Sequence, residues 1–184
     1  MREIINLETE RLIIRNFCAS DWEDLAELAI KYEKTELAKY DEGPWPSDTA
    51  EYKTIVKQMG EADNFLAVIL KENRKLIGLI YKAPKDEKRI EFGFNFNIDY
   101  QGKGYATESC KKAIDYIFNI LNIRVISAGT AKLNQPSNKL LKKLGFIKIN
   151  DKIIAFRKDE EGNPIEFEAI DYSLKREDWL SQSY

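Results

Sequence analysis

Residues 100–108 read YQGKGYATE and lie between a predicted strand and a predicted helix. Gly102 and Gly104 allow a tight turn and a close approach to a ligand, because neither residue has a Cβ. The first amides of the following helix would point outward without intrahelical partners, at its positive end. This geometry binds phosphate or pyrophosphate, and Lys103 and Thr107 would add a charge and a hydroxyl. The spacing alone fits equally well a strand-to-helix joint that binds no ligand.

A helix is expected to follow this segment, from Gly104 to about Asn119. Apolar residues recur at helical spacing along one face, namely Ala106, Cys110, Ala113, Ile114, Ile117 and Leu121. Lys111 and Lys112 occupy the opposite face. Cys110 is therefore expected to pack in the core, and not to act as a nucleophile.

The strand before the segment, residues 89–97, has two different faces. Ile90, Phe92, Phe94 and Phe96 share one face, whereas Glu91, Gly93, Asn95 and Asn97 share the other. Glu91 is a candidate general base, because a carboxylate shielded from water there would suit deprotonation of an ammonium group, directly or through water. The alternative is an exposed glutamate at a sheet edge, or one paired with Lys82 or Arg89.

The remaining pattern predicts an α+β fold in a single domain over residues 1–184. Further strands are expected at residues 9–17, 65–71, 75–82, 124–129, 146–157 and 164–174, and further helices at residues 20–35, 47–59 and 134–144. Short turns at 72–73 and 84–86 predict an antiparallel meander. The order of elements predicts a mostly antiparallel sheet with a βαβ insertion.

Composition narrows the class of protein. The chain has 29 basic and 31 acidic side chains, so it lacks the basic field typical of nucleic-acid binding. Apolar runs such as residues 65–70 are far too short to span a membrane. Residues 1–6 show no signal peptide, and Cys18 and Cys110 form no spaced cluster, so a cytoplasmic location with reduced thiols is expected.

The chain contains no histidine. This excludes Ser-His-Asp and Cys-His catalysis, HExxH metal sites and imidazole general bases. Any proton transfer must therefore use carboxylates, Tyr, Lys, Cys or water. No metal is expected.

Four segments resemble one family. Gln101, Gly104 and Ala106 match the [RQ]-x-x-G-x-[GA] acyl-CoA loop of the GNAT N-acetyltransferases, and residues 102–108 resemble its Rim-type branch, which acetylates N-termini of ribosomal proteins. ETERL at residues 8–12, NQPSN at 134–138 followed by LGF at 144–146, and DYSL at 171–174 before Asp178-Trp179 resemble the same branch. The resemblance runs in order from about residue 8 to 179.

The resemblance implies direct transfer of an acetyl group from acetyl-CoA to a primary amine, on a GNAT-like sheet with helices on both faces. The strands at 89–97 and 124–129 would splay apart and hold pantetheine, with the Phe96 amide polarising the thioester carbonyl. Pyrophosphate would bind the backbone amides of Gln101, Gly102, Lys103, Gly104, Tyr105, Ala106 and Thr107. Asn134 would contact the cofactor, and Ser137 would protonate the leaving thiolate. A Tyr does so in many other GNAT enzymes, so Ser137 is carried over from this branch only.

Plainer roles stay open. Asn134 is also a typical helix N-cap, and Ser137 is common in a first helical turn without function. Residues 40–45, YDEGPW, would form either a rim for a cationic acceptor or a solvated loop. A protein N-terminus, an amino acid, a polyamine and a drug are all possible acceptors, and a homodimer is left open. The alternative function is an inactive acyl-CoA-binding or sensor domain.

Overall fold

The structure is a computed structural model that describes residues 4–181. Its strands are β1 (Asn6–Glu8), β2 (Leu12–Asn16), β3 (Phe65–Leu70), β4 (Leu76–Asp86), β5 (Arg89–Phe96), β6 (Val125–Ala131), β7 (Ile147–Lys158) and β8 (Pro164–Lys175). Its α-helices are α1 (Trp22–Glu33), α2 (Glu51–Glu61), α3 (Tyr105–Asn119), α4 (Gln135–Lys143) and α5 (Arg176–Ser181). Three 3-10 turns are η1 (Ala19–Asp21), η2 (Ala38–Tyr40) and η3 (Ile98–Tyr100). Within the described residues, none of the helices is both long and apolar enough to cross a membrane.

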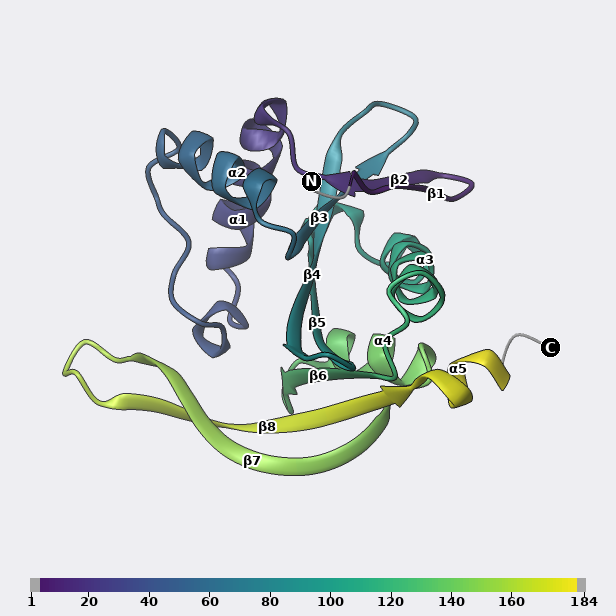
Figure 1. Cartoon of the computed structure of the whole chain (residues 1–184). Helices are drawn as coiled ribbons and strands as arrows, with labels where there is room; N and C mark the ends of the chain where they lie inside the picture. The colour runs from purple at the N-terminus through teal and green to yellow at the C-terminus, as the bar shows by residue number, and fades with distance from the viewer. Residues whose placement is uncertain (1–3, 182–184) are drawn as a thin grey trace.

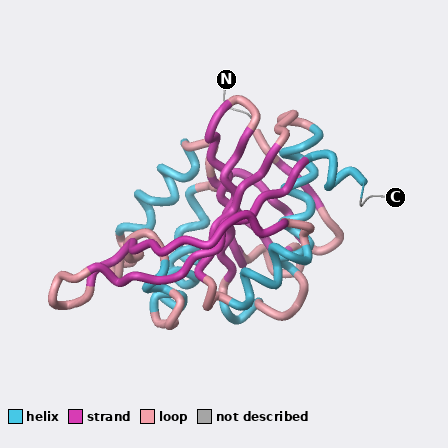
Figure 2. The backbone as a smooth tube through the Cα atoms, turned by 90° about the horizontal axis from the view of Figure 1, so that it is seen from below, coloured by secondary structure: helices cyan, strands magenta, loops and turns pink. Residues whose placement is uncertain are grey.

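The eight strands form one sheet in the order β1-β2-β3-β4-β5-β6-β8-β7. Neighbouring strands are antiparallel except β5 and β6, which are parallel. Helices α1 and α2 cover one face and α3 and α4 the other (Figure 1, Figure 2). This arrangement confirms the predicted mostly antiparallel sheet with a βαβ insertion and helices on both faces.

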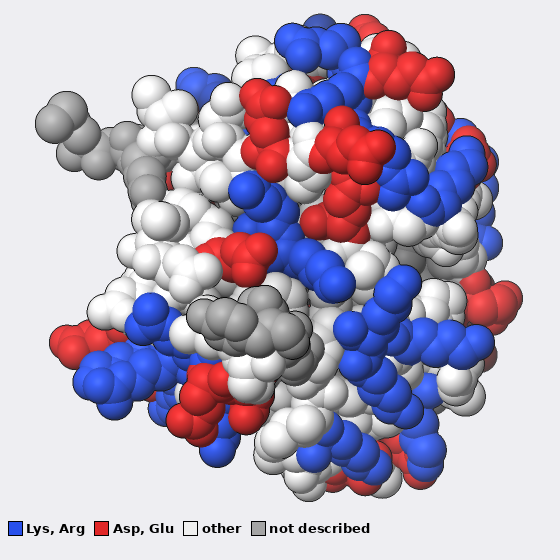
Figure 3. All heavy atoms as spheres, turned by 90° about the vertical axis from the view of Figure 1, so that its right-hand side faces the viewer, with Lys and Arg blue, Asp and Glu red and all other residues white. Residues whose placement is uncertain are grey.

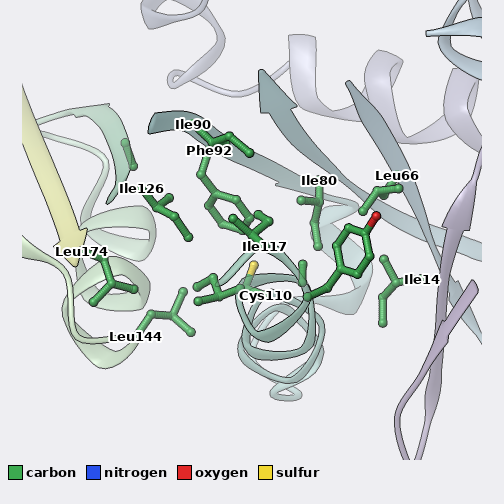
Figure 4. Close-up of a cluster of buried hydrophobic side chains, with 14 of the residues drawn as sticks. Ile14, Leu66, Ile80, Ile90, Phe92, Cys110, Ile117, Ile126, Leu144 and Leu174 are labelled. Atoms are coloured by element: carbon green, nitrogen blue, oxygen red, sulfur yellow. The ribbon is translucent and has the colours of Figure 1, made fainter. Parts of the chain in front are cut away.

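The larger core lies between the sheet and α3. The apolar face of β5 contributes to this core, because alternate residues of the strand face the helix. Ile90 and Phe92 point toward Cys110 and Ile117 of α3, and all four side chains are almost fully buried (Figure 4). Cys110 is fully buried in the core as expected, and this burial raises the pKa of its thiol.

The strands β5 and β6 pair over only three positions. Arg89, Ile90 and Glu91 pair with residues 125–127, and then the two strands part. Beyond that point β5 stays paired with β4 as far as Phe96, and β6 stays paired with β8 as far as Ala131. Figure 1 shows β6, β8 and β7 turning away from β4 and β5. The predicted splayed strand pair is therefore present.

Three boundaries and one further helix differ from the sequence prediction. The predicted strand at 9–17 is the second arm of a hairpin, because the Thr9 N–H donates to Leu12 O and closes a turn after β1. β4 continues through the predicted turn at 84–86 with a register shift. The Asp48 side chain accepts from the Ala50 N–H in a local turn, so α2 begins at Glu51 and not at Ser47. Helix α5 was not predicted.

We predict that Gly78→Ala destabilises the fold by about 1–3 kcal/mol, because it overpacks the end of β5. A Cβ at this position would collide with the Phe96 ring and lie 2.9 Å from the Asn95 carbonyl oxygen. Gly93→Ala is the matched control on the adjacent strand, because its Cβ would meet Tyr81 at an ordinary 3.6 Å. Urea denaturation measures both. Equal stability of the two variants would contradict this account of packing at the end of β5.

Candidate active site

The glycine-rich segment forms an open turn at the start of α3. Gly102 and Gly104 have φ values of 75° and 83°, in the left-handed region that favours glycine. Gly104 is the N-cap residue of α3, and no side chain caps that end of the helix. A Cβ on Gly102 would meet no atom within 4 Å. The turn therefore offers free space beside the positive end of a 15-residue helix.

The end of β5 lies next to this turn. The Asn97 N–H donates to Ile77 O of β4 at 2.9 Å. Because successive residues of a strand direct their N–H groups to opposite edges, the Phe96 N–H points to the edge that β6 has left. The Gln101 side chain donates to Phe96 O at 3.2 Å, on the same edge. Phe96 thus presents a backbone donor between the parted strands.

Asn134 and Ser137 lie at the start of α4, directly after the end of β6. The Asn134 side chain is the N-cap of α4 and accepts from the Ser137 N–H at 3.2 Å. Both side chains are half-buried. The predicted capping role of Asn134 is thus present, and it leaves the Ser137 hydroxyl in the first turn of the helix. Phe96, the glycine turn and this pair therefore gather at the carboxyl ends of β5 and β6.

Asn138 and Tyr172 anchor this arrangement. Buried Asn138 donates to Ala131 O at 3.0 Å and to Asn134 O at 2.7 Å, and it accepts from the Tyr172 hydroxyl at 2.8 Å. These contacts join the end of β6, the start of α4 and β8. Sequence analysis did not select either residue, although both lie in segments that carried the family resemblance.

Glu91 lies apart from this group. It occupies the last position of β5 that pairs with β6, opposite Ser127. It lies five positions before Phe96, which corresponds to about 16 Å of extended strand. Its side chain is 41% exposed and forms an ion pair with Lys85 at 2.5 Å, rather than with Lys82 or Arg89. A base at this position would have to reach the acyl site through water.

The segment between α1 and α2 is held by Arg157 of β7. The Arg157 guanidinium makes two hydrogen bonds of 2.9 Å to the Glu33 carboxylate, and it donates to Gly43 O at 2.8 Å and Asp41 O at 3.1 Å. Hydrogen bonding to Arg157 holds the pKa of Glu33 below its ordinary value. The Trp45 N–H also donates to Glu33. The segment is therefore anchored at several points, while residues 42–44 are exposed to solvent.

This segment also contains an aromatic ring packed on β8 and a shielded carboxylate. The Tyr40 ring packs 4.9 Å from the Phe167 ring of β8. Burial raises the pKa of Asp41. Lys85 interacts electrostatically with Glu42 as well as with Glu91.

Acidic and basic side chains are interspersed on the face that carries α3, in keeping with the net charge of −2 (Figure 3). Residues 4–181 contain no cluster of three or more His, Cys, Asp or Glu side chains that could hold a metal ion.

Comparison with known proteins identifies the family. Residues 11–147 match the "Acetyltransferase (GNAT) domain". The chain is 32% identical to "Uncharacterized N-acetyltransferase YnaD" of Bacillus subtilis, over 77% of this chain and 82% of that protein. It is 27% identical to "Putative ribosomal N-acetyltransferase YdaF" of the same organism, over 92% and 94% of the two chains, in line with the Rim-type resemblance.

A solved structure shares the fold. It is the spermidine N-acetyltransferase of Vibrio cholerae in complex with CoA and spermine, with a TM-score of 0.76 and 19% identity. The match covers 94% of this chain and 99% of that one. Sequence, fold and the parted strand pair agree: the chain belongs to the GNAT family and is an acyl-CoA-dependent N-acetyltransferase.

Proposed function

We propose that this enzyme transfers an acetyl group from acetyl-CoA to a primary amine by direct attack. The observation that carries the proposal is the parting of β5 and β6 beside an uncapped helix start. CoA bound to a protein of the same fold supports it. The two free cysteines are compatible with the cytoplasmic location that we also propose.

Acetyl-CoA would bind along the parted strands. Its pantetheine amides would pair with the free edge of β5, and its pyrophosphate would accept hydrogen bonds from backbone amides of residues 101–107. Lys103 would add a positive charge, and Asn134 would contact the cofactor from the start of α4. In this pose the Phe96 N–H would meet the thioester carbonyl oxygen and stabilise its developing negative charge.

The reaction would proceed through a tetrahedral intermediate, with proton transfers at the amine nitrogen and at the thiolate sulfur. The neutral amine nitrogen attacks the thioester carbon, the tetrahedral intermediate collapses, and the C–S bond breaks. Ser137 protonates the leaving thiolate and regains a proton, through water, from the attacking nitrogen, which yields CoA and the amide. The proton that the ammonium form of the acceptor loses before the attack would pass through water to Glu91, since that carboxylate is too distant for direct contact, and then to solvent.

The acceptor would approach from the side of residues 40–45. Asp41 and Glu42 supply carboxylates and Tyr40 an aromatic face, which together suit a positively charged amine. The tie between Arg157 and Glu33 would fix this rim before the acceptor arrives. A protein N-terminus and a polyamine both meet this requirement, and a screen of amine acceptors by release of the CoA thiol would distinguish them.

Cofactor binding is tested with the turn glycines. We predict that CoA raises the melting temperature of the wild-type protein, because it binds the folded state, and that Gly104→Ala weakens CoA binding about tenfold or more. Gly162→Ala is the matched control, because Gly162 has a similar φ of 86° but lies in open space at the tip of the β7–β8 hairpin. Calorimetry measures both affinities. Unchanged CoA affinity in Gly104→Ala would identify the turn as a structural joint.

Ser137→Ala is predicted to lower kcat with little change in the KM for acetyl-CoA, because protonation of the leaving group matters mainly in the transition state. Steady-state kinetics with a fixed amine acceptor measures the effect. The Asn134 cap accepts from the backbone N–H of residue 137, so the substitution should leave helix α4 intact. Full turnover in this variant would assign the protonation to water or to another residue.

Glu91→Gln is predicted to keep CoA affinity, to lower kcat at neutral pH by roughly 10²-fold, and to recover as pH nears the pKa of the amine. The physical reason is that a free amine forms without help at high pH. Lys85→Gln is the control, because it removes the ion pair but keeps the carboxylate. A Glu91→Gln enzyme with wild-type kcat would show that solvent alone deprotonates the acceptor.

A further inference from the structure

The turn between β1 and β2 packs against the start of α3 through one glutamate. Glu108 accepts three hydrogen bonds from this turn: from the Thr9 hydroxyl at 2.5 Å, the Arg11 N–H at 3.0 Å and the Arg11 Nε at 2.7 Å. Arg11 Nη2 also lies 2.6 Å from a Glu108 carboxylate oxygen. Residues almost 100 positions apart in the sequence are thereby joined beside the glycine turn.

The Arg11 guanidinium reaches beyond Glu108 to the turn itself. Its Nη1 donates to Lys103 O at 3.1 Å, and its central carbon lies 4.5 Å from the centre of the Tyr105 ring. A Cβ on Gly104 would lie 3.4 Å from Arg11 Nη2. Arg11 therefore contacts the residues before and after Gly104 and lies close to Gly104 itself.

These contacts fix which groups of the turn face the ligand space. A carbonyl oxygen beside a phosphate would repel it, whereas an N–H would bind it. Arg11 holds the Lys103 carbonyl in a hydrogen bond, so this oxygen faces the guanidinium and its partial negative charge is offset. Because Glu108 balances the charge of Arg11, geometry and not net charge is the main contribution of the pair.

We propose that Arg11 and Glu108 are positioning residues that hold the backbone of residues 103–105 in its phosphate-binding conformation. The pair thereby sets the affinity for the nucleotide diphosphate part of the acyl-CoA. This inference rests on the proposed binding of acetyl-CoA at the turn. A lysine cannot replace Arg11, because one ammonium group cannot reproduce the planar fork that binds a carboxylate and a carbonyl together.

The test compares Arg11→Lys and Glu108→Gln with wild type by calorimetry, with CoA and with pantetheine as probes. CoA affinity should fall about tenfold in each variant, whereas pantetheine affinity should stay within about twofold. Pantetheine lacks the nucleotide diphosphate, so a general loss of structure would weaken both ligands. Arg89→Lys is the matched control, because Arg89 is an exposed arginine paired with Asp86 at the opposite end of β5.

A kinetic measurement separates this inference from the proposed function. With acetyl-CoA and acetylpantetheine as donors, each variant should lose most of its preference for acetyl-CoA and keep its kcat at saturation. Wild-type CoA affinity in both variants would overturn the positioning role. If wild type binds CoA but acetylates no amine, the proposed function fails while the calorimetric test of Arg11 and Glu108 stands.

Discussion

The pairing of β5 with β6 stops after three positions, and the candidate site follows from that interruption. β5 stays hydrogen-bonded to β4, and β6 stays hydrogen-bonded to β8. Only the edges of β5 and β6 that face each other lose their hydrogen-bond partners. Unpaired backbone groups away from water are unfavourable. A ligand that carries its own amides, as pantetheine does, would restore the missing pairs. The interruption thus breaks the continuous hydrogen bonding of the sheet and leaves the strand edge at which we propose that the cofactor binds.

The ends of the gap are built from different contacts. At β5, close packing between Gly78 and Phe96 leaves no room for a Cβ, so the backbone that carries the Phe96 N–H cannot shift freely. At β6, Asn138 and Tyr172 bind the strand end to α4 and β8. The Phe96 N–H and the start of α4 are therefore each held by contacts outside the gap, and a donor held in place can stabilise a developing charge without reorganisation.

Signals within short stretches predicted most of the fold. The alternation of β5, the glycine turn and the helical spacing of α3 are local, and each appears in the structure where the sequence indicates it. Side-chain contacts between distant segments were not predictable in this way. Arg11 and Glu108 are 97 positions apart and Arg157 and Glu33 are 124 apart, so no local pattern joins them. The partner of Glu91 was missed because Lys85 lies on β4, which continues past the expected turn.

Two arginines make the same kind of contact, Arg11 beside the glycine turn and Arg157 beside residues 40–45. Each extends from a strand or its turn, forms a bidentate or forked pair with a helix glutamate, and also binds carbonyl oxygens of an adjoining loop. The planar guanidinium has enough donors for both tasks. The Arg157 side chain is 15% exposed and the Arg11 side chain 42%, so solvent screens the Arg157–Glu33 ion pair less than the Arg11–Glu108 ion pair. The hydrophobic core fixes where the strands lie, and these two polar contacts hold the adjoining loops, which on our proposal sets the loop atoms that face each substrate.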